Sequence, residues 1–265
     1  MIIKGEKKDE NLILSYIGEN FYRCPYLFLD FKKYGTTSKN VNLYIQKKNE
    51  KIIALILIYY SGMHIYSKDN DLDYNELLTF VLDKKPSMIC AEKSIVFELS
   101  KFISDYGYKS DFGYVRGIDK VEDVESTIEL KEATIDDFNK IVNLLLSDPG
   151  LGASYTYDEL YCQLIDRFNE NYGRNFVLIE NDKIIGHVCS GAENEKMVIL
   201  TDLIVDSLYR GRGLGKKICN SFCKIMLNEG KKVFLIAYTQ KANEIYEKIG
   251  FKIFCEWGKL YLEKK

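Results

Sequence analysis

The fold and function of this chain are indicated most clearly by the stretch Asp202-Leu-Ile-Val-Asp-Ser-Leu-Tyr-Arg-Gly-Arg-Gly-Leu-Gly-Lys-Lys217. Its apolar start predicts a buried strand, which leads into a glycine-rich turn and an amphipathic helix. Such a turn directs several backbone N–H groups at one point, and the helix N-terminus adds about half a positive charge. Glycines at 211, 213 and 215 let the backbone approach a ligand closely. With the nearby cations Arg210, Arg212 and Lys216, the stretch predicts a pyrophosphate site.

Other glycine-rich motifs fit this stretch less well. A P-loop requires the spacing GxxxxGK[ST], which is absent. A dinucleotide-binding turn requires GxGxxG after the first strand of a parallel unit, whereas the spacing here is Gly-x-Gly-x-Gly after a strand in a hairpin-rich region. A tight turn with solvated basic side chains is the remaining alternative.

The second half of the chain alternates strands and helices in a readable order. Thr134 is the expected N-cap of the first helix, and Gly250 is expected to end the last. The pattern predicts an α/β fold with a mixed sheet and helices on its faces. The expected strands are 127–131, 176–180, 183–189, 198–205, 233–238 and two short ones around Trp257; the expected helices are 134–146, 157–168, 213–228 and 240–249.

The first half echoes the second in two places. Residues 48–53 resemble residues 180–185, both within a predicted strand, turn and strand. Residues 102–109 resemble residues 245–252, where a helix ends at a glycine followed by an aromatic residue. The first half has no glycine-rich turn between these landmarks, and a polar stretch at 67–75 stands in its place. Two related halves are therefore expected, of which the second alone keeps the anion-binding turn.

Two motifs at a fitting separation resemble those of the GNAT superfamily of N-acetyltransferases. Arg210-Gly-Arg-Gly-Leu-Gly215 is similar to the R/Q-x-x-G-x-G/A signature, and Asn243-Glu-Ile-Tyr-Glu-Lys-Ile-Gly-Phe251 looks like the second motif. The resemblance implies a catalytic, acetyl-CoA-binding domain at 125–265 and a degenerate GNAT-like domain at 1–122. The whole chain resembles tandem-domain members of the FR47-like branch.

The resemblance also implies roles for individual residues. The strand before the turn, Leu203, Ile204 and Val205, would bind acetyl-CoA through its main-chain amides, with that of Leu203 stabilising the oxyanion. Tyr246 would protonate the departing thiolate as general acid, and Asn243 would contact the pantetheine or the surroundings of the tyrosine. Amides of the turn would hold the pyrophosphate: Arg210, Gly211, Arg212, Gly213, Leu214, Gly215 and Lys216.

The sequence departs from the family pattern at two places. Thr239 stands where many members have an asparagine that contacts pantetheine. Many members have a glutamate that acts as general base on the strand before the turn. At the corresponding place this chain has Asp202, expected at the end of its strand, which is the candidate catalytic base. Glu193 and Glu195 could act through water instead, so the base stays open. Tyr246 also lies on an apolar helical face, where a plain core role is the alternative.

Composition narrows the function classes. Hydrophobic residues make up 46% and charged residues 29% of the 265, and the net charge of -2 leaves no footprint for nucleic acid or an anionic membrane. Seven scattered cysteines and two histidines indicate neither a disulfide framework nor a metal site. We expect a cytoplasmic enzyme that transfers acetyl to a small-molecule or peptide amine without a metal. The alternative is a CoA-binding sensor or scaffold without turnover, and the sequence leaves the oligomeric state open.

Overall fold

The computed structural model describes residues 1–120, 127–152 and 155–262. The chain forms two compact units. Unit 1 contains Met1–Arg116, Ile236–Thr239 and Ile253–Lys265, and unit 2 contains Gly117–Leu235 and Gln240–Lys252. The last strand therefore belongs to the unit that holds the beginning of the chain. The domains expected at 1–122 and 125–265 are segments of sequence, and their boundaries stay a prediction.

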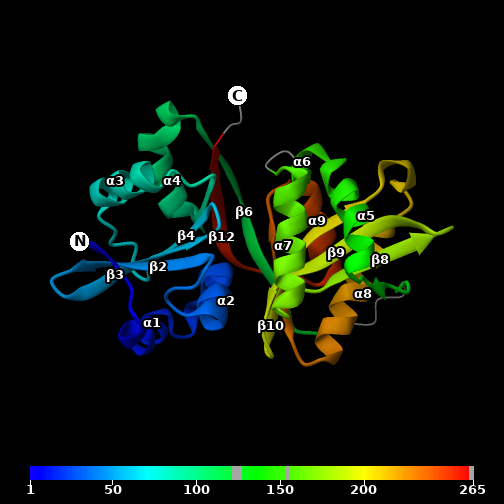
Figure 1. Ribbon diagram of the computed structural model, residues 1–265, viewed down its shortest axis with the longest axis horizontal. Helices are drawn as coiled ribbons and strands as arrows, with labels where there is room; N and C mark the ends of the chain where they lie inside the picture. Colours follow the sequence, from blue (N-terminus) through cyan, green and yellow to red (C-terminus); the bar gives the residue numbers. More distant parts are fainter. Residues whose placement is uncertain (121–126, 153–154, 263–265) are drawn as a thin grey trace. The chain divides into compact units, whose positions relative to one another are not determined.

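Unit 1 is a mixed sheet with the strand order β1-β2-β3-β4-β5-β12-β6. Strands β1 to β4 are antiparallel, β4 and β5 are parallel, and β12 is antiparallel to β5. Figure 1 shows β12 in red, the end of the chain, among the strands of this unit. The elements are β1 (Ile2–Lys4), α1 (Glu10–Ile17), α2 (Pro25–Tyr34), β2 (Val41–Lys48), β3 (Lys51–Tyr59), β4 (Gly62–Tyr66), α3 (Tyr74–Lys84), β5 (Met88–Glu92), α4 (Lys93–Ile103), β6 (Tyr108–Ile118) and β12 (Lys252–Leu262), with 3-10 turns at Lys7–Asp9, Asn20–Arg23 and Ser104–Tyr106.

The apolar strand β3 supplies both faces of this sheet, as its long run of apolar residues predicts. Ala54 and Ile56 belong to the core cluster that includes residues of α3 and α4. Leu55 and Leu57 belong to the cluster that includes residues of α1 and α2. Successive residues of a strand point to opposite faces, so a strand covered on both sides is apolar throughout.

Unit 2 has the strand order β7-β8-β9-β10-β11. Among the described strands of this order, β10 and β11 pair in parallel and the other neighbours pair antiparallel. Figure 1 shows α5 and α7, both green, lying together, and their apolar side chains share a core with Val177, Ile184 and Ile204. The elements are β7 (Lys131–Glu132), α5 (Ile135–Leu146), α6 (Pro149–Gly152), α7 (Tyr157–Asn169), β8 (Asn175–Glu180), β9 (Lys183–Glu193), β10 (Met197–Val205), a 3-10 turn (Ser207–Tyr209), α8 (Leu214–Asn228), β11 (Lys232–Ala237) and α9 (Gln240–Ile249).

Most of the predicted elements of the second half are confirmed. Thr134 caps α5 in a capping box with Asp137, and the helix ends at Leu146 as expected. The hairpin of β8 and β9 turns at Asn181 and Asp182, both with positive φ, which is the geometry of a two-residue hairpin loop.

Two predictions of strands are wrong. The strand expected at 127–131 is reduced to Lys131–Glu132, because the backbone of Ile128 bonds to the hydroxyl of Ser221 on α8. The two short strands expected around Trp257 are one strand, β12. Gly258 does not mark a turn there. It lies where a Cβ would come within 2.8 Å of Val96 on α4, so the strand continues past it in close contact with the helix.

The two halves of the sequence share a detailed hairpin geometry. The turn of β2 and β3 also has two residues with positive φ, Asn49 and Glu50. Each hairpin has a register shift at the same distance from its turn, between Gln46 and Lys47 in one and between Leu178 and Ile179 in the other. Since a shared bulge is a feature that related folds keep, this match supports the relation between the halves that the sequence predicts.

Candidate functional site

Strands β10 and β11 separate after a short parallel ladder. They pair only from Met197 to Ile199 on β10, although β10 continues to Val205. The amide of Asp206 donates to Ile185 on β9, so by the alternation of a strand the amides of Leu203 and Val205 point to the other edge. That edge faces the region where β11 has left the ladder, and it offers backbone donors to an extended ligand.

The glycine-rich turn that follows β10 leads into α8 with an open N-terminus. Gly211 and Gly213 have φ of 81° and 72°, a conformation that glycine adopts without strain. Gly213 is the N-cap of α8, so the N-cap residue has no side chain that could accept a hydrogen bond from the first turn. A Cβ built on either glycine meets no atom within 4 Å. This combination of open space and backbone donors is suited to an anion.

The two arginines of the turn bind groups of the protein. Arg210 donates from Nε to the carbonyl of Val205 at 3.0 Å and pairs with Asp148 at 2.8 Å. Arg212 pairs with Glu180 at 3.3 Å and lies over the ring of Tyr209. Both arginine side chains therefore have partners within the protein, and the turn retains the backbone amides from Gly211 to Lys216 as hydrogen-bond donors.

Asp202 lies in a β-bulge inside β10, not at the end of the strand as the sequence suggested. Thr201 pairs with Cys189 and Ile204 with His187, so β10 carries one extra residue between these pairs. Asp202 takes φ of 52°, which is uncommon for a residue other than glycine. The bulge turns its side chain toward the face that α5 and α7 cover.

The carboxylate of Asp202 is held by two short side-chain contacts. The thiol of Cys189 donates to Oδ2 at 3.3 Å, and the hydroxyl of Thr201 donates to Oδ1 at 3.1 Å. Burial raises the pKa of the Cys189 thiol well above its usual value, so the sulfur keeps the proton that it donates. These two contacts fix the orientation of the carboxylate, and each oxygen has a further lone pair for a hydrogen bond.

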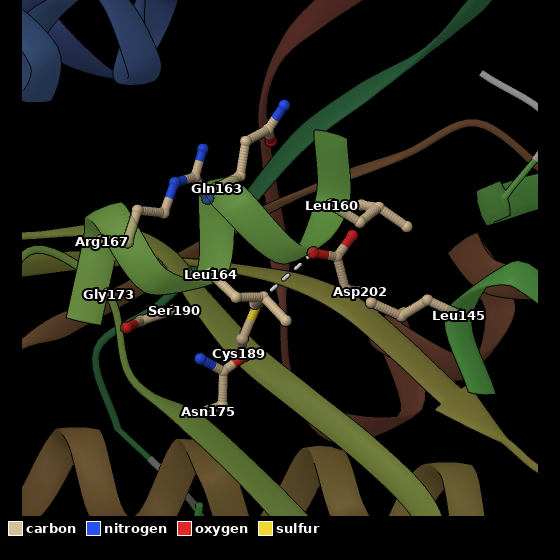
Figure 2. A pocket seen from close by; sticks show the side chains of 10 residues that line it. All are labelled: Leu145, Leu160, Gln163, Leu164, Arg167, Gly173, Asn175, Cys189, Ser190 and Asp202. Atoms are coloured by element: carbon tan, nitrogen blue, oxygen red, sulfur yellow. Dashed lines mark hydrogen bonds between the residues drawn. The ribbon is translucent and has the colours of Figure 1, made fainter. Parts of the chain in front are cut away.

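A small cavity of about 30 Å³ opens at this carboxylate. Figure 2 shows Asp202 from β10, Cys189 from β9 and the side chains of α7 around it. The volume suits one or two groups the size of a water molecule or an ammonium. The lining residues are Leu145, Leu160, Gln163, Leu164, Arg167, Gly173, Asn175, Cys189, Ser190 and Asp202.

Sequence reasoning missed the partners of Asp202. In the sequence, Cys189 is one of seven scattered cysteines, and His187 is one of two histidines, too few for a histidine-rich metal site. His187 is fully buried and bonds both the backbone of Asp202 and the side chain of Asn175. The bulge that brings these groups together depends on long-range pairing, so no local signal marks them.

Tyr246 lies on α9 near α8. Its ring meets Phe251 edge-on at 5.6 Å, and its carbonyl accepts from the amide of Phe251 at 3.0 Å. Burial raises its pKa, and the nearby thiols Cys219 and Cys223 on α8 raise it further. The hydroxyl therefore holds its proton through the neutral range. Asn243 lies one turn earlier on the same helix.

The glutamates considered as alternative bases lie elsewhere. Glu193, at the end of β9, pairs with Arg174 at 3.0 Å and with Lys231 at 3.6 Å. Glu195 follows in the turn to β10. Neither lines the cavity at Asp202. Over the ranges that the structure describes, no three His, Cys, Asp or Glu side chains gather as metal ligands would. None of the helices described there is long and apolar enough to cross a membrane.

The sequence of the second half is similar to known acetyltransferases. Residues 138–251 match the acetyltransferase (GNAT) family. A 53-residue segment, 20% of the chain, is 36% identical to a glucosamine 6-phosphate N-acetyltransferase of Trypanosoma brucei brucei, and it spans 36% of that relative.

Solved structures share the fold over the whole chain. A GNAT-family acetyltransferase from Colwellia psychrerythraea is 12% identical with a TM-score of 0.60, covering 99% of this chain and 100% of that one. A tandem GNAT protein from the clavulanic acid biosynthesis pathway is 10% identical with a TM-score of 0.57, covering 100% of this chain and 99% of that one. The open strand edge and the glycine turn both lie within residues 138–251, the part of the chain that is similar to the acetyltransferase (GNAT) family.

Proposed function

We propose that the chain is an N-acetyltransferase that transfers the acetyl group of acetyl-CoA to an amine by direct attack. The observation that carries this proposal is the arrangement around β10 in unit 2. One edge of the strand offers backbone donors beside the open N-terminus of α8, and its bulge places the carboxylate of Asp202 in a separate cavity. A cofactor arm and an acceptor amine can therefore reach the same strand from different sides.

The residues of the turn fit acetyl-CoA. Its pyrophosphate would lie at the amides from Gly211 to Lys216, where the helix N-terminus favours negative charge. Its pantetheine would run along the edge of β10 and bond the amide of Val205. Acetyl-CoA supplies an activated acyl thioester, and the chain supplies binding, orientation and proton transfer.

Three groups of the chain would act on the reacting atoms. The carboxylate of Asp202 takes a proton from the acceptor ammonium, which has an unperturbed pKa of about 10.4 for a lysine-like amine. The amide of Leu203 donates to the carbonyl oxygen as negative charge develops there. Tyr246 donates the proton of its hydroxyl to the departing sulfur, which its raised pKa permits because the proton is present at neutral pH.

The acceptor would enter at the cavity beside Asp202. The leucines of α5 and α7 in its wall favour an amine carried on an apolar stem, from a small molecule or a peptide. Residues 148–157, which lead from α5 through α6 to the start of α7, would line this side, and residues 153–154 lie outside the described residues. The sugar phosphate in the name of the trypanosomal relative makes amino sugars one class to include in an acceptor panel.

The first half would be a copy of the fold without a cofactor site. Its helix α3 begins at Asp73, whose side chain accepts from the amide of Glu76 at 3.1 Å. This carboxylate occupies the position that an external anion would need at a helix N-terminus. We infer that acetyl-CoA binds in the second half alone.

The test combines binding with turnover. Acetyl-CoA at 100 times its dissociation constant should stabilise the chain by about 2.7 kcal/mol in thermal unfolding. Release of free thiol is then followed with a panel of amines. Tyr246→Phe should lower kcat by about 100-fold or more and leave the affinity for acetyl-CoA unchanged. Tyr74→Phe, which changes a part-buried tyrosine of α3, is the matched control.

Each outcome has a defined meaning. Binding without thiol release across a broad panel would favour a CoA-binding sensor over an enzyme. Equal losses of affinity and kcat in Tyr246→Phe would remove the assignment of Tyr246 as general acid. Absence of any acetyl-CoA binding would contradict the proposed function as a whole.

A further inference from the structure

His187 on β9 is the one histidine of unit 2, and both of its ring nitrogens have partners. Its side chain is fully buried. Nδ1 lies 3.0 Å from the carbonyl oxygen of Asp202, and Nε2 lies 2.9 Å from Oδ1 of Asn175. The backbone of Asn175 on β8 is held in place, because its main-chain carbonyl accepts a hydrogen bond from the amide of Ala133 at 2.8 Å. The ring therefore connects a fixed point of the sheet to the bulge.

The chemistry of these partners sets the tautomer of the ring. A carbonyl oxygen only accepts, so Nδ1 carries a proton and donates it to Asp202. Burial lowers the pKa of His187, so the ring is neutral and Nε2 accepts. Asn175 satisfies Nε2 with its N–H₂ group when its amide is turned by 180°, which leaves the shape of the side chain unchanged.

The bulge leaves the Asp202 carbonyl in need of such a donor. Asp202 and Leu203 have no paired residue on β9, since the register passes from Thr201 directly to Ile204. A buried carbonyl without a partner carries a substantial free-energy cost. The φ of 52° adds backbone strain that the surroundings must hold in place.

We propose that His187 is a positioning residue for acetyl transfer, which fixes the bulge by donating from Nδ1 to the Asp202 carbonyl. This inference rests on the proposed function. The same peptide unit joins Asp202, whose carboxylate lies at the acceptor cavity, to Leu203, whose amide lies at the cofactor edge. One hydrogen bond from His187 therefore sets the positions of the base and the oxyanion donor together.

A pair of variants separates positioning from general packing. In His187→Asn the side-chain N–H₂ lies as far from the backbone as Nδ1 and can still donate to Asp202. In His187→Gln the amide reaches as far as Nε2, so it keeps the contact with Asn175 and loses the bond to Asp202. Each variant thus loses one of two hydrogen bonds, and a purely structural role predicts equal effects.

The proposal predicts unequal effects on catalysis. His187→Gln should lower kcat by about 100-fold, the loss expected when reacting groups shift by about 1 Å. His187→Asn should keep kcat within about 5-fold of the unchanged protein. Both should keep KM for acetyl-CoA within about 3-fold, because the pyrophosphate turn is separate. Equal losses of kcat in the two variants, or a larger loss in His187→Asn, would overturn the proposal.

A spectroscopic measurement tests the hydrogen bond without any turnover. The chain has two histidines, so ¹⁵N-histidine spectra contain two rings, which His64→Leu assigns. We expect a neutral ring protonated at Nδ1 for His187. A ring protonated at Nε2 would overturn the proposal even if the enzyme is active. An inactive protein with the Nδ1–H ring would instead contradict the proposed function and leave the hydrogen bond to Asp202 established.

Discussion

Helix α3 in unit 1 and helix α8 in unit 2 each follow a strand that begins with a short parallel ladder. The two helices differ in how the backbone amides of their first turns find hydrogen-bond acceptors. In unit 1 the side chain of Asp73 accepts from the first turn of α3. In unit 2 Gly213 offers no side chain, and the first turn of α8 is open. A helix start with its own carboxylate cap has less need of an external anion, whereas an uncapped one in open space can bind it. The two helix starts therefore differ at a single N-cap residue, Asp73 in unit 1 and Gly213 in unit 2.

The strands before these helices differ in a related way. In each unit a parallel ladder extends over three residue pairs, from Gly62 to His64 on β4 and from Met197 to Ile199 on β10. In unit 1 the guanidinium of Arg23 bonds the carboxylate of Glu92 at 2.6 Å and the carbonyl of Lys68 at 2.9 Å. Arg23 therefore bridges the ends of β4 and β5. In unit 2 the corresponding strand edge carries the amides assigned to the ligand.

The largest expected effect tests the role of Asp202, which lies in the β-bulge of β10 in unit 2. Asp202→Asn should lower kcat/KM by about 100- to 1000-fold near neutral pH, because the amide cannot take a proton from the acceptor. Activity should rise again toward pH 10, where solution deprotonates the amine. The measurement is thiol release as a function of pH.

The control for that variant is Asp182→Asn, at a turn residue that also has positive φ. It makes the same chemical change within unit 2, and its rate should match that of the unchanged protein. A rate for Asp202→Asn within about 3-fold of the control would contradict the assignment of the base.

The second effect concerns the acid stability that a buried histidine of unit 1 confers. Burial lowers the pKa of His64 on β4 from 6.5 to about 4, and its Nδ1 makes no hydrogen bond to any described residue. Below pH 6.5 the unfolded chain takes up this proton while the folded chain does not, so stability is complete above pH 6.5 and falls until about pH 4. Each unit of pKa difference is worth about 1.4 kcal/mol, which gives a loss of about 2 kcal/mol between pH 7.5 and 5.

Denaturant unfolding of the full chain at both pH values measures this loss. The variant His64→Leu has no proton to gain there and should lose about 2 kcal/mol less than the unchanged protein over the same interval. An identical pH dependence of the two proteins would show that His64 titrates normally in the fold.

The third effect tests the open helix start directly. Gly213→Val places a β-branched side chain at φ of 72°, which strains the turn and displaces the amides that converge there. The dissociation constant of acetyl-CoA should rise by about 10-fold or more, since about 1.4 kcal/mol corresponds to a factor of ten. Gly230→Val is the matched control.

Gly230 has φ of 78° and, like Gly213, open space around its missing side chain, but it ends α8 at the other terminus. The control variant therefore carries similar backbone strain without a change at the turn. Similar affinities in the two variants would show that strain, not the loss of converging amides, weakens binding.

The smallest effect concerns the capped helix of unit 1. Asp73→Ala removes the acceptor for the amide of Glu76 and should reduce the free energy of unfolding by about 1 kcal/mol. It should leave the affinity and the rate of the enzyme unchanged, since no ligand is assigned to α3. A large loss of acetyl-CoA affinity in this variant would place a cofactor site in unit 1.

Helix caps and turns could be predicted from the sequence, because each depends on a few adjacent residues. Thr134 and Asp137 form the expected capping box, and the glycines of the turn at 211–215 mark the start of α8. These features indicated the strand and the helix at which the cofactor site is proposed.

The features that the sequence did not predict depend on pairing between strands that are far apart in the chain. No local sequence signal predicts the bulge at Asp202, because an aspartate at this position indicates neither a positive φ nor an extra residue in the strand pairing. Gly258 looks like a turn residue but lies against Val96 in a continuous strand. The role of His187 depends on both neighbours of β9, and the membership of β12 in unit 1 depends on its pairing with β5.

Calorimetric titration of the full chain with acetyl-CoA is the most direct test of the difference between the two helix starts. The account predicts one binding site per chain, a heat signal lost or strongly weakened in Gly213→Val, and an unchanged signal in Asp73→Ala. Two sites per chain, or binding that Asp73→Ala abolishes and Gly213→Val leaves intact, would contradict it.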